Sequence, residues 1–286
     1  MPRAAVLGQP IAHSMSPILH SAGYKALGLD DWSYSRIEAN ADTLPGIVAD
    51  AEEDYRGFSV TMPGKFAALN FATSVTERAR LMGSANTLVR TEEGWQADNT
   101  DTEGVQGALN ELLGRADGLR ITDSSKSEPR ALLIGAGGTA RPALWALAQR
   151  GIKHIDLLNR SDRRGELQHL TEKLGLTIEP VTYDDNIEAI AHRAEVIIST
   201  VPSEAIADHS FALAHAPVLD VIYDPWPTPL TVHAAADGYP TVGGHRMLAY
   251  QSFSQFEQYT GQEAPREAMF EALNIYMRDK NVNRLY

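Results

Sequence analysis

A glycine-rich stretch in the middle of the chain has the residue types and spacing that could bind a dinucleotide. Gly135-Ala136-Gly137-Gly138-Thr139-Ala140 follows an apolar run and precedes a helical pattern, as a G-x-G-x-x-A loop should. The first glycine allows a tight turn, the second lets the backbone approach a pyrophosphate, and the small sixth residue lets helix and strand pack closely. The helix N-terminus then binds the phosphates. We expect cofactor contacts from Gly135, Gly137, Gly138, Thr139 and Ala140; the alternative is a glycine-rich turn that binds nothing.

The residues after the next strand indicate which dinucleotide is bound. About 20 residues past the glycine loop, an NAD-binding protein usually offers a carboxylate to the ribose 2′-hydroxyl. Here the strand ends in Leu158-Asn159-Arg160-Ser161, and Asp156 lies inside the strand. An arginine would bind a 2′-phosphate through charge-assisted hydrogen bonds. We therefore predict NADP, held by Asn159, Arg160, Ser161 and Arg164, although Arg163 and Arg164 could equally belong to a solvated surface loop.

These loops need a parallel sheet to position them, and the surrounding pattern predicts one. Strands are expected at 130–134, 154–158, 194–200 and 218–222, with a helix at 138–150. Helices are expected from residue 243 onward and at 264–280. The polar stretch 117–129 reads as a loop near a domain boundary or as an ordinary surface loop.

The first hundred residues repeat the alternation of strand and helix. Strands are predicted at 4–8, 32–37 and 57–61, and a hairpin at 86–90 and 95–98. Helices are predicted at 16–27, with Ser16 as N-cap before Pro17, at 41–54, and after Pro63. Alternating strands and helices indicate an α/β protein with a mostly parallel sheet.

Composition narrows the class of protein. The 286 residues suggest about two domains. The formal net charge of −12 argues against nucleic-acid binding. The chain has no cysteine, which removes disulfides and thiolate metal sites, and no metal site is predicted. Neither a signal peptide nor an apolar run of about 18 residues is present, so we expect a soluble, cytoplasmic protein that does not engage a membrane.

Several further segments, taken in order, resemble one family along nearly the whole chain. They are GQPIAHSMSP, SVTMPGK, GSANTL, DNTDTEG, GAGGTAR, NRS, STVP, YDPWPTPL and GGHRMLAYQSFSQFEQYTG. Together they resemble the shikimate dehydrogenases of the shikimate/quinate dehydrogenase family, especially the biosynthetic actinobacterial form. The chain departs from many relatives at Ser59, where they have asparagine, and at Ser161, where they have threonine.

The resemblance implies reversible NADPH-dependent reduction of 3-dehydroshikimate to shikimate, in the biosynthesis of chorismate and the aromatic amino acids. It implies that Ser14 and Ser16 hold the substrate carboxylate and that Tyr223 reaches toward it. The ring hydroxyls and the reacting carbon would be surrounded by Thr61, Lys65, Asn86, Asp101 and Gln251. Hydroxyl, amide and carboxylate groups suit a small polyhydroxylated acid better than an apolar slot would.

Lys65 and Asp101 are the expected catalytic residues. Hydride addition to a ketone creates an alkoxide, to which lysine can donate a proton and whose charge it can stabilise. Asp101 would orient the lysine, bind a hydroxyl or relay a proton. Taken singly, Lys65 could be a surface lysine and Asp101 a helix N-cap. Likewise Ser16 could be only an N-cap, Asn86 a turn residue and Gln251 one more residue of an amphipathic helix.

The resemblance also implies a domain organisation. A substrate domain would comprise 1–104 and 246–286, an NADP-binding Rossmann domain would comprise 105–245, and the active site would lie in the cleft between them. Two other functions compete: an NAD-dependent quinate/shikimate dehydrogenase, which should carry an acidic residue near Asn159, and a non-catalytic NADP-binding sensor, which should lack Lys65 or Asp101. The protein could be a monomer or a homodimer.

Overall fold

The computed structural model describes residues 1–114 and 128–283, with side chains described up to residue 280. Within this range the chain forms two compact units. One comprises Met1–Asp101 and Leu248–Tyr286, and the other comprises Thr102–Met247. The predicted loop at 117–129 lies outside the described residues as far as residue 127. None of the described helices has the length and hydrophobicity that a transmembrane span requires.

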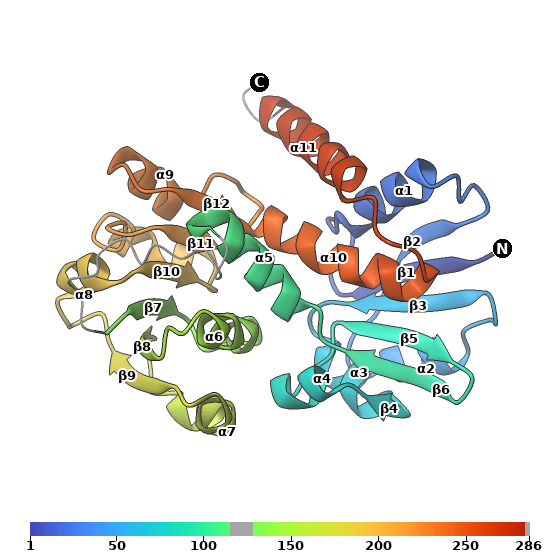
Figure 1. Cartoon of the computed structure of the whole chain (residues 1–286), viewed down its shortest axis with the longest axis horizontal. Helices are drawn as coiled ribbons and strands as arrows, with labels where there is room; N and C mark the ends of the chain where they lie inside the picture. Colours follow the sequence, from blue (N-terminus) through green and yellow to red (C-terminus); the bar gives the residue numbers. More distant parts are fainter. Residues whose placement is uncertain (115–127, 284–286) are drawn as a thin grey trace. The chain divides into compact units, whose positions relative to one another are not determined.

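The first unit is built on a mixed six-stranded sheet in the order β2-β1-β3-β5-β6-β4 (Figure 1). Its strands are β1 (Arg3–Gly8), β2 (Ser33–Glu38), β3 (Tyr55–Val60), β4 (Ser74–Val75), β5 (Thr87–Thr91) and β6 (Gly94–Asp98). β1 pairs in parallel with β2 and β3, whereas β5 runs antiparallel to both β3 and β6. The predicted hairpin is therefore confirmed as β5 and β6.

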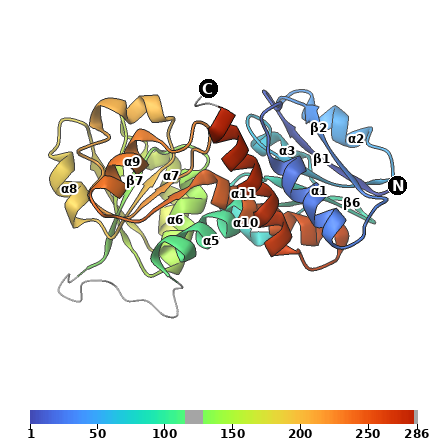
Figure 2. The same ribbon diagram turned by 90° about the horizontal axis from the view of Figure 1, so that it is seen from above.

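The helices of the first unit come from both ends of the chain. They are α1 (Ser16–Ala26), α2 (Leu44–Ala49), α3 (Lys65–Phe71), α4 (Glu77–Met82), the start of α5 (Asp101–Leu113), most of α10 (Gly244–Thr260) and α11 (Arg266–Asn283). α11 packs against α1, so the C-terminal helix lies beside the N-terminal one (Figure 2). The core beneath α2 and α3 includes Leu7, Phe58 and Leu88, all with no exposed surface. This burial explains the apolar runs of the central strands.

The second unit is a doubly wound parallel sheet in the order β12-β11-β10-β7-β8-β9. The strands are β7 (Arg130–Ile134), β8 (His154–Leu158), β9 (Thr177–Val181), β10 (Val196–Ser199), β11 (Val218–Asp220) and β12 (Thr241–Gly243). All their pairings are parallel. Renumbered within the unit, this is the 3-2-1-4-5-6 order of a Rossmann fold, in which ligands bind beyond the carboxyl ends of the strands where the order reverses, here between β7 and β10.

The connecting helices of this unit lie on both sides of its sheet. They are α6 (Ala140–Gln149), α7 (Arg164–Leu174), α8 (Ile187–Arg193), the 3-10 helix η2 (Ser203–His209) and α9 (Pro229–Ala236). α6 and α7 lie on one side and α8 on the other (Figures 1 and 2). The α/β class and the Rossmann-type unit expected from the sequence are confirmed.

Two local predictions for the first unit were wrong. The helix expected at 41–54 is only Leu44–Ala49, because the Asn40 side chain accepts hydrogen bonds from the backbone N–H groups of Asp42 and Thr43 and holds the preceding residues in a turn. Ser16 is not the N-cap of α1: Met15 occupies that position, without a side-chain cap, and Ser16 is already helical.

Candidate active site

The carboxyl edge of the first sheet collects residues from four strands. β1 ends at Gly8 and β3 at Val60, and Thr61 follows directly. Because β5 runs the other way, Asn86 precedes it at the same edge, and Asp101 follows the end of β6 there. Sequence-distant polar residues are thus brought to one edge by strand direction alone.

Lys65 and Asp101 form an ion pair at this edge. Each is the first residue of its helix, α3 and α5, and Lys65 Nζ lies 2.5 Å from Asp101 Oδ2. The side chains are 21% and 10% exposed, so the pair is shielded but reachable. An aspartate in a first turn is favoured by the helix dipole, whereas a lysine there is not. A lysine at this position therefore does not stabilise α3. The Asp101 carboxylate offsets the unfavourable interaction of Lys65 with the helix dipole.

Asn86 is the centre of the hydrogen-bond network around this pair. Its amide nitrogen donates to Asp101 Oδ1 at 3.0 Å and to Gln251 Oε1 at 3.1 Å. Its oxygen accepts the backbone N–H of Thr100 at 2.8 Å. Only 2% of Asn86 is exposed, so it is a buried connector rather than a turn residue at the surface. Both oxygens of Asp101 are therefore occupied, one by Asn86 and one by Lys65.

Gln251 is oriented by its own helix. Its amide nitrogen donates to the Leu248 carbonyl at 3.0 Å and to Ser252 Oγ at 2.7 Å, which leaves its oxygen for Asn86 and for Thr100 Oγ1 at 3.2 Å. It is 6% exposed. The amphipathic-helix alternative does not account for this set of polar contacts.

The serines of the first motif lie at the start of α1. Ser14 Oγ accepts the backbone N–H of Ser16 at 3.4 Å and lies 3.3 Å from Ser16 Oγ. The Arg36 guanidinium donates to the Ser14 carbonyl at 3.0 Å through Nε, which brings a positive charge beside the two hydroxyls. Among the described residues, neither serine is hydrogen-bonded to Lys65. Hydroxyls next to a cation suit a carboxylate ligand.

Thr61 is placed by a close approach of two strand ends. Its backbone N–H donates to the Leu7 carbonyl at 2.9 Å. A Cβ at Gly8 would lie 2.3 Å from Thr61 Cγ2, so only glycine at position 8 leaves room for the threonine side chain. Thr61 is half-buried at the same sheet edge as the Lys65–Asp101 pair.

Sequence reasoning missed the groups that hold Asn86 and the turn before α5. Gln255, one helical turn beyond Gln251, donates to the Asn86 carbonyl at 3.0 Å and accepts from Ser59 Oγ at 2.7 Å. The spacing of the two glutamines on one helix face was the available signal. Ser59 also accepts the Tyr34 hydroxyl at 2.6 Å, which gives this departure from the family a buried polar role.

Asp98 anchors the turn that leads to Asp101. It accepts the backbone N–H of Asn99 at 2.8 Å, Thr76 Oγ1 at 2.7 Å and Arg78 Nε at 2.6 Å. Burial alone would raise the pKa of Asp98, but the hydrogen bonds from Arg78 and Thr76 outweigh burial and hold the pKa below its usual value. A charged, fixed Asp98 thus sets where α5 begins.

In the second unit, the glycine loop has the geometry that the spacing predicts. Gly135 has φ +95°, and a Cβ there would lie 2.6 Å from Val201 Cγ1. A Cβ at Gly137 or Gly138 would meet no atom within 4 Å, and Ala140 is fully buried. The Thr139 side chain does not cap α6. An open loop before an uncapped ten-residue helix fits the diphosphate of a dinucleotide.

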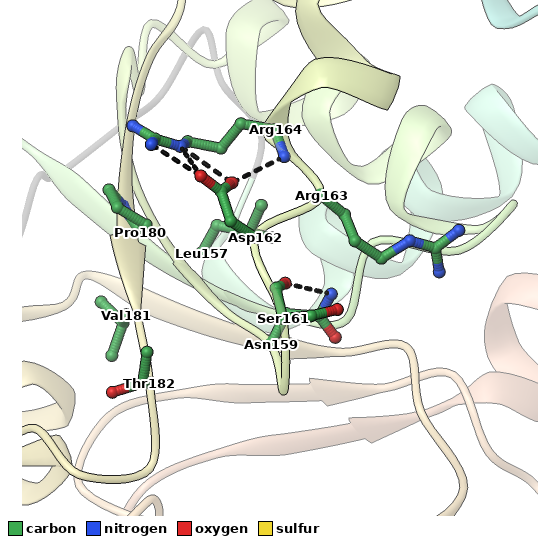
Figure 3. A pocket seen from close by; sticks show the side chains of 9 residues that line it. All are labelled: Leu157, Asn159, Ser161, Asp162, Arg163, Arg164, Pro180, Val181 and Thr182. Carbon is green, nitrogen blue, oxygen red and sulfur yellow. Dashed lines mark hydrogen bonds and ion pairs between the residues drawn. The ribbon is translucent and has the colours of Figure 1, made fainter.

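A small pocket adjoins the end of β8, as Figure 3 shows. Its lining residues are Leu157, Asn159, Ser161, Asp162, Arg163, Arg164, Pro180, Val181 and Thr182. Arg164 is turned back onto Asp162 at 2.7 Å, and its hydrogen bond holds the pKa of Asp162 at about 2. Asn159 Nδ2 donates to the Ser161 carbonyl at 3.1 Å.

The three arginines beyond β8 differ in their partners. Arg163 pairs with Glu166, and Arg164 pairs with Asp162. Arg160 is exposed and makes no ion pair within the described part of the chain. Asp156 is fully buried and paired with Arg130 and Arg193, so it does not face a ribose. Arg160 is thus the arginine best able to take a new anionic partner.

Tyr223 belongs to the second unit, in the segment between β11 and α9. It is half-buried, and burial raises its pKa above the ordinary value. At neutral pH it therefore stays a neutral hydroxyl that can donate a hydrogen bond.

Three family profiles match successive parts of the chain. They are described as the shikimate dehydrogenase substrate binding domain (residues 6–88), shikimate/quinate 5-dehydrogenase (119–217) and the shikimate 5′-dehydrogenase C-terminal domain (244–273). A shikimate dehydrogenase (NADP(+)) from Microcystis aeruginosa is 31% identical, with 94% of each chain covered. The chain also matches pentafunctional AROM polypeptides of Saccharomyces cerevisiae at 32% identity, but it spans only 17% of their length.

Solved structures agree with the sequence matches. The Mycobacterium tuberculosis shikimate dehydrogenase is 46% identical, with a TM-score of 0.87 over 96% of this chain and 100% of that one. A shikimate 5-dehydrogenase from Thermus thermophilus, solved with NADP(H) and shikimate, is 29% identical, with a TM-score of 0.76 over 96% of this chain and 99% of that one.

Proposed function

Because this chain belongs to the shikimate dehydrogenase family, we propose that it catalyses the reversible NADPH-dependent reduction of 3-dehydroshikimate to shikimate, a step toward chorismate and the aromatic amino acids. The observation that carries the proposal is the Lys65–Asp101 pair at 2.5 Å, held by Asn86 at the carboxyl edge of the first sheet. A protein that only senses NADP would have no need of a shielded, reachable ion pair there.

Lys65 supplies the proton in this proposal. When bound, NADPH contributes the hydride that reduces the ketone carbon. The ketone oxygen then gains negative charge, which the Lys65 ammonium stabilises and neutralises by giving up a proton. Asp101 has one oxygen on Asn86 and the other on Lys65, so we assign it to orienting the lysine rather than to donating the proton.

The remaining predicted residues bind the rest of the substrate. We assign Ser14 and Ser16, beside Arg36, to holding the carboxylate, and Tyr223, through its neutral hydroxyl, to substrate binding. Thr61, Asn86 and Gln251 contact the ring hydroxyls. The fixed orientation of the Gln251 amide supports this role, because a preorganised polar group rejects analogues that lack its partner.

The second unit holds the cofactor. Gly135 to Ala140 receive the diphosphate, and Arg160, supported by Asn159 and Ser161, binds the 2′-phosphate. Arg164 contributes once it leaves Asp162. We accordingly assign substrate binding to residues 1–104 and 246–286, and NADP binding to 105–245. Location in the cytoplasm and a monomeric or homodimeric state stay predictions.

An assay with matched substrates tests the proposal. Initial rates are measured with shikimate or quinate, each with NADP or NAD. We expect the highest kcat/KM for shikimate with NADP. Higher efficiency with NAD and quinate would replace the proposal with a quinate dehydrogenase, and no turnover with any pair would leave only a binding protein.

A further inference from the structure

A cluster of metal-ligating side chains lies in the second unit, on the α8 side of its sheet. It consists of Glu188, His192 and His215, whose ligand atoms all lie within 4.8 Å of one another. Glu188 and His192 are four residues apart on α8, so they project from the same face of that helix. His215 comes from the segment before β11, near the α9 end that carries Asp237.

His215 is held in the form that binds a metal. Its Nδ1 lies 2.8 Å from Asp237 Oδ2, a hydrogen bond that the neutral imidazole makes by carrying its proton on Nδ1. Nε2 is then left with a lone pair. Metal-binding histidines are commonly oriented by a carboxylate in this way.

The second ring nitrogen of His215, Nε2, makes no hydrogen bond within the described part of the chain. The side chain is only 10% exposed, and Nε2 is buried without a hydrogen-bond partner among the described residues. On this side of the ring, Glu188 Oε1 lies 3.9 Å from Nε2, a distance too long for a hydrogen bond. A buried, unpaired nitrogen aimed at a carboxylate is costly unless something joins them.

The separations of the three groups and the exposure of two of them are compatible with a bound ion. Ligands about 2.0–2.1 Å from a tetrahedral Zn²⁺ lie a little over 3 Å apart. Glu188 and His192 are exposed, so both can rotate to close the present separations. The His192 and His215 rings are stacked with centroids 4.1 Å apart, so the two imidazoles already lie side by side.

We propose that Glu188, His192 and His215 form a binding site for a zinc-type divalent transition-metal ion that ties α8 to the segment before β11. Two imidazoles and one carboxylate suit such an ion, whereas Mg²⁺ and Ca²⁺ prefer oxygen ligands throughout. Three protein ligands leave a coordination position for water. Asp237 is the positioning residue of the site, and the proposal is independent of the catalytic one.

Calorimetric titration of Zn²⁺ into chelator-treated, tag-free full-length protein tests the site. The parent should bind one ion per chain. His192→Ala and Glu188→Gln, both at exposed positions where folding is undisturbed, should each weaken binding at least tenfold. His169→Ala, which removes an exposed histidine from α7 of the same unit, should bind within twofold of the parent.

Thermal unfolding with and without Zn²⁺ gives a second measure. The ion should raise the Tm of the parent and of His169→Ala, but not that of His192→Ala. The proposal is overturned if the parent binds no stoichiometric zinc, if His192→Ala and Glu188→Gln bind as tightly as the parent, or if His169→Ala loses the ion as well.

Discussion

Asp101 shows how a single carboxylate can bind two neighbouring side chains at once. One oxygen accepts from the buried amide of Asn86, and the other accepts from Lys65. Asn86 is in turn held by two hydrogen bonds. Its side-chain oxygen accepts the backbone N–H of Thr100, and its backbone carbonyl accepts the side-chain amide of Gln255. The carboxylate is thus fixed from one side and fixes the lysine on the other.

Asp101→Asn should therefore lower kcat at least tenfold while changing the KM for shikimate only severalfold. The amide can still face Asn86, but an NH₂ group cannot accept from the lysine ammonium. Steady-state kinetics with shikimate and NADP would measure both constants. A kcat within twofold of the parent would show that Lys65 does not depend on Asp101 for its orientation.

Arg160→Ala should raise the KM for NADP about 10- to 100-fold, because it removes charge-assisted hydrogen bonds to the 2′-phosphate, and bonds of this kind typically contribute that much to affinity. The KM for NAD should change less than twofold, because NAD has no 2′-phosphate. Arg163→Ala is the matched control, since Arg163 is already paired with Glu166. An equal effect of the two substitutions on the KM for NADP would remove Arg160 from its assigned role.

At the scale of elements, both sheets present their functional residues beyond strand ends. In the second unit, strand and loop meet closely at Gly135, where β7 passes into the loop before α6. Its backbone is left-handed and the Val201 side chain fills the place of a Cβ.

Gly135→Ala should therefore lower the free energy of unfolding by more than about 2 kcal/mol, from left-handed strain and overpacking together. Gly165→Ala, in α7 with open space around it, should leave stability unchanged or slightly increased. Denaturant unfolding of both variants measures this. Equal stability of Gly135→Ala and the parent would show that the loop is looser than its geometry indicates.

The elements that the sequence predicted well are those whose burial dictates their pattern. The strands at 130–134 and 154–158 have the predicted bounds, because nearly every residue in them is buried and turn residues flank them. The helix at 41–54 was overestimated because a local side-chain turn at Asn40 competes with helical hydrogen bonds. Helix propensities of single residues do not include such competition.

The site was predicted residue by residue but not as a network. Lys65 and Asp101 were identified through motifs, yet nothing in their sequence positions shows that Asn86 joins Asp101 to Gln251. Long-range partners such as these depend on strand order. The same limit hid the histidine cluster: Glu188 and His192 have visible helical spacing, but Asp237 and His215 become partners only in the folded unit.

For the whole molecule, buried histidines make stability depend on pH. His20 is fully buried against Tyr34, with ring centroids 4.2 Å apart, and burial lowers its pKa from 6.5 to about 3. Since the folded pKa lies below the unfolded one, the contribution of His20 to stability is complete above pH 6.5. It is lost progressively as pH falls from 6.5 toward 3, because only the unfolded chain takes up the proton.

Between pH 7.5 and pH 5, His20 should account for about 2 kcal/mol of lost stability. The measurement is the free energy of unfolding of the parent and of His20→Gln at both pH values. The variant should lose about 2 kcal/mol less stability than the parent between pH 7.5 and pH 5. His169→Gln, at an exposed position, should behave as the parent does. An identical loss in the parent and His20→Gln would mean that His20 titrates alike in both states.

The most direct test of the central claim is the turnover of Lys65→Ala with shikimate and NADP. Removing the proton donor should lower kcat by about 10²–10⁴-fold, with the KM for shikimate within a fewfold of the parent, because Asn86, Gln251 and the serines remain. Lys25→Ala, at an exposed position in α1, should keep full activity. A Lys65→Ala enzyme whose kcat stayed within a fewfold of the parent would contradict the assignment of Lys65 as the proton donor.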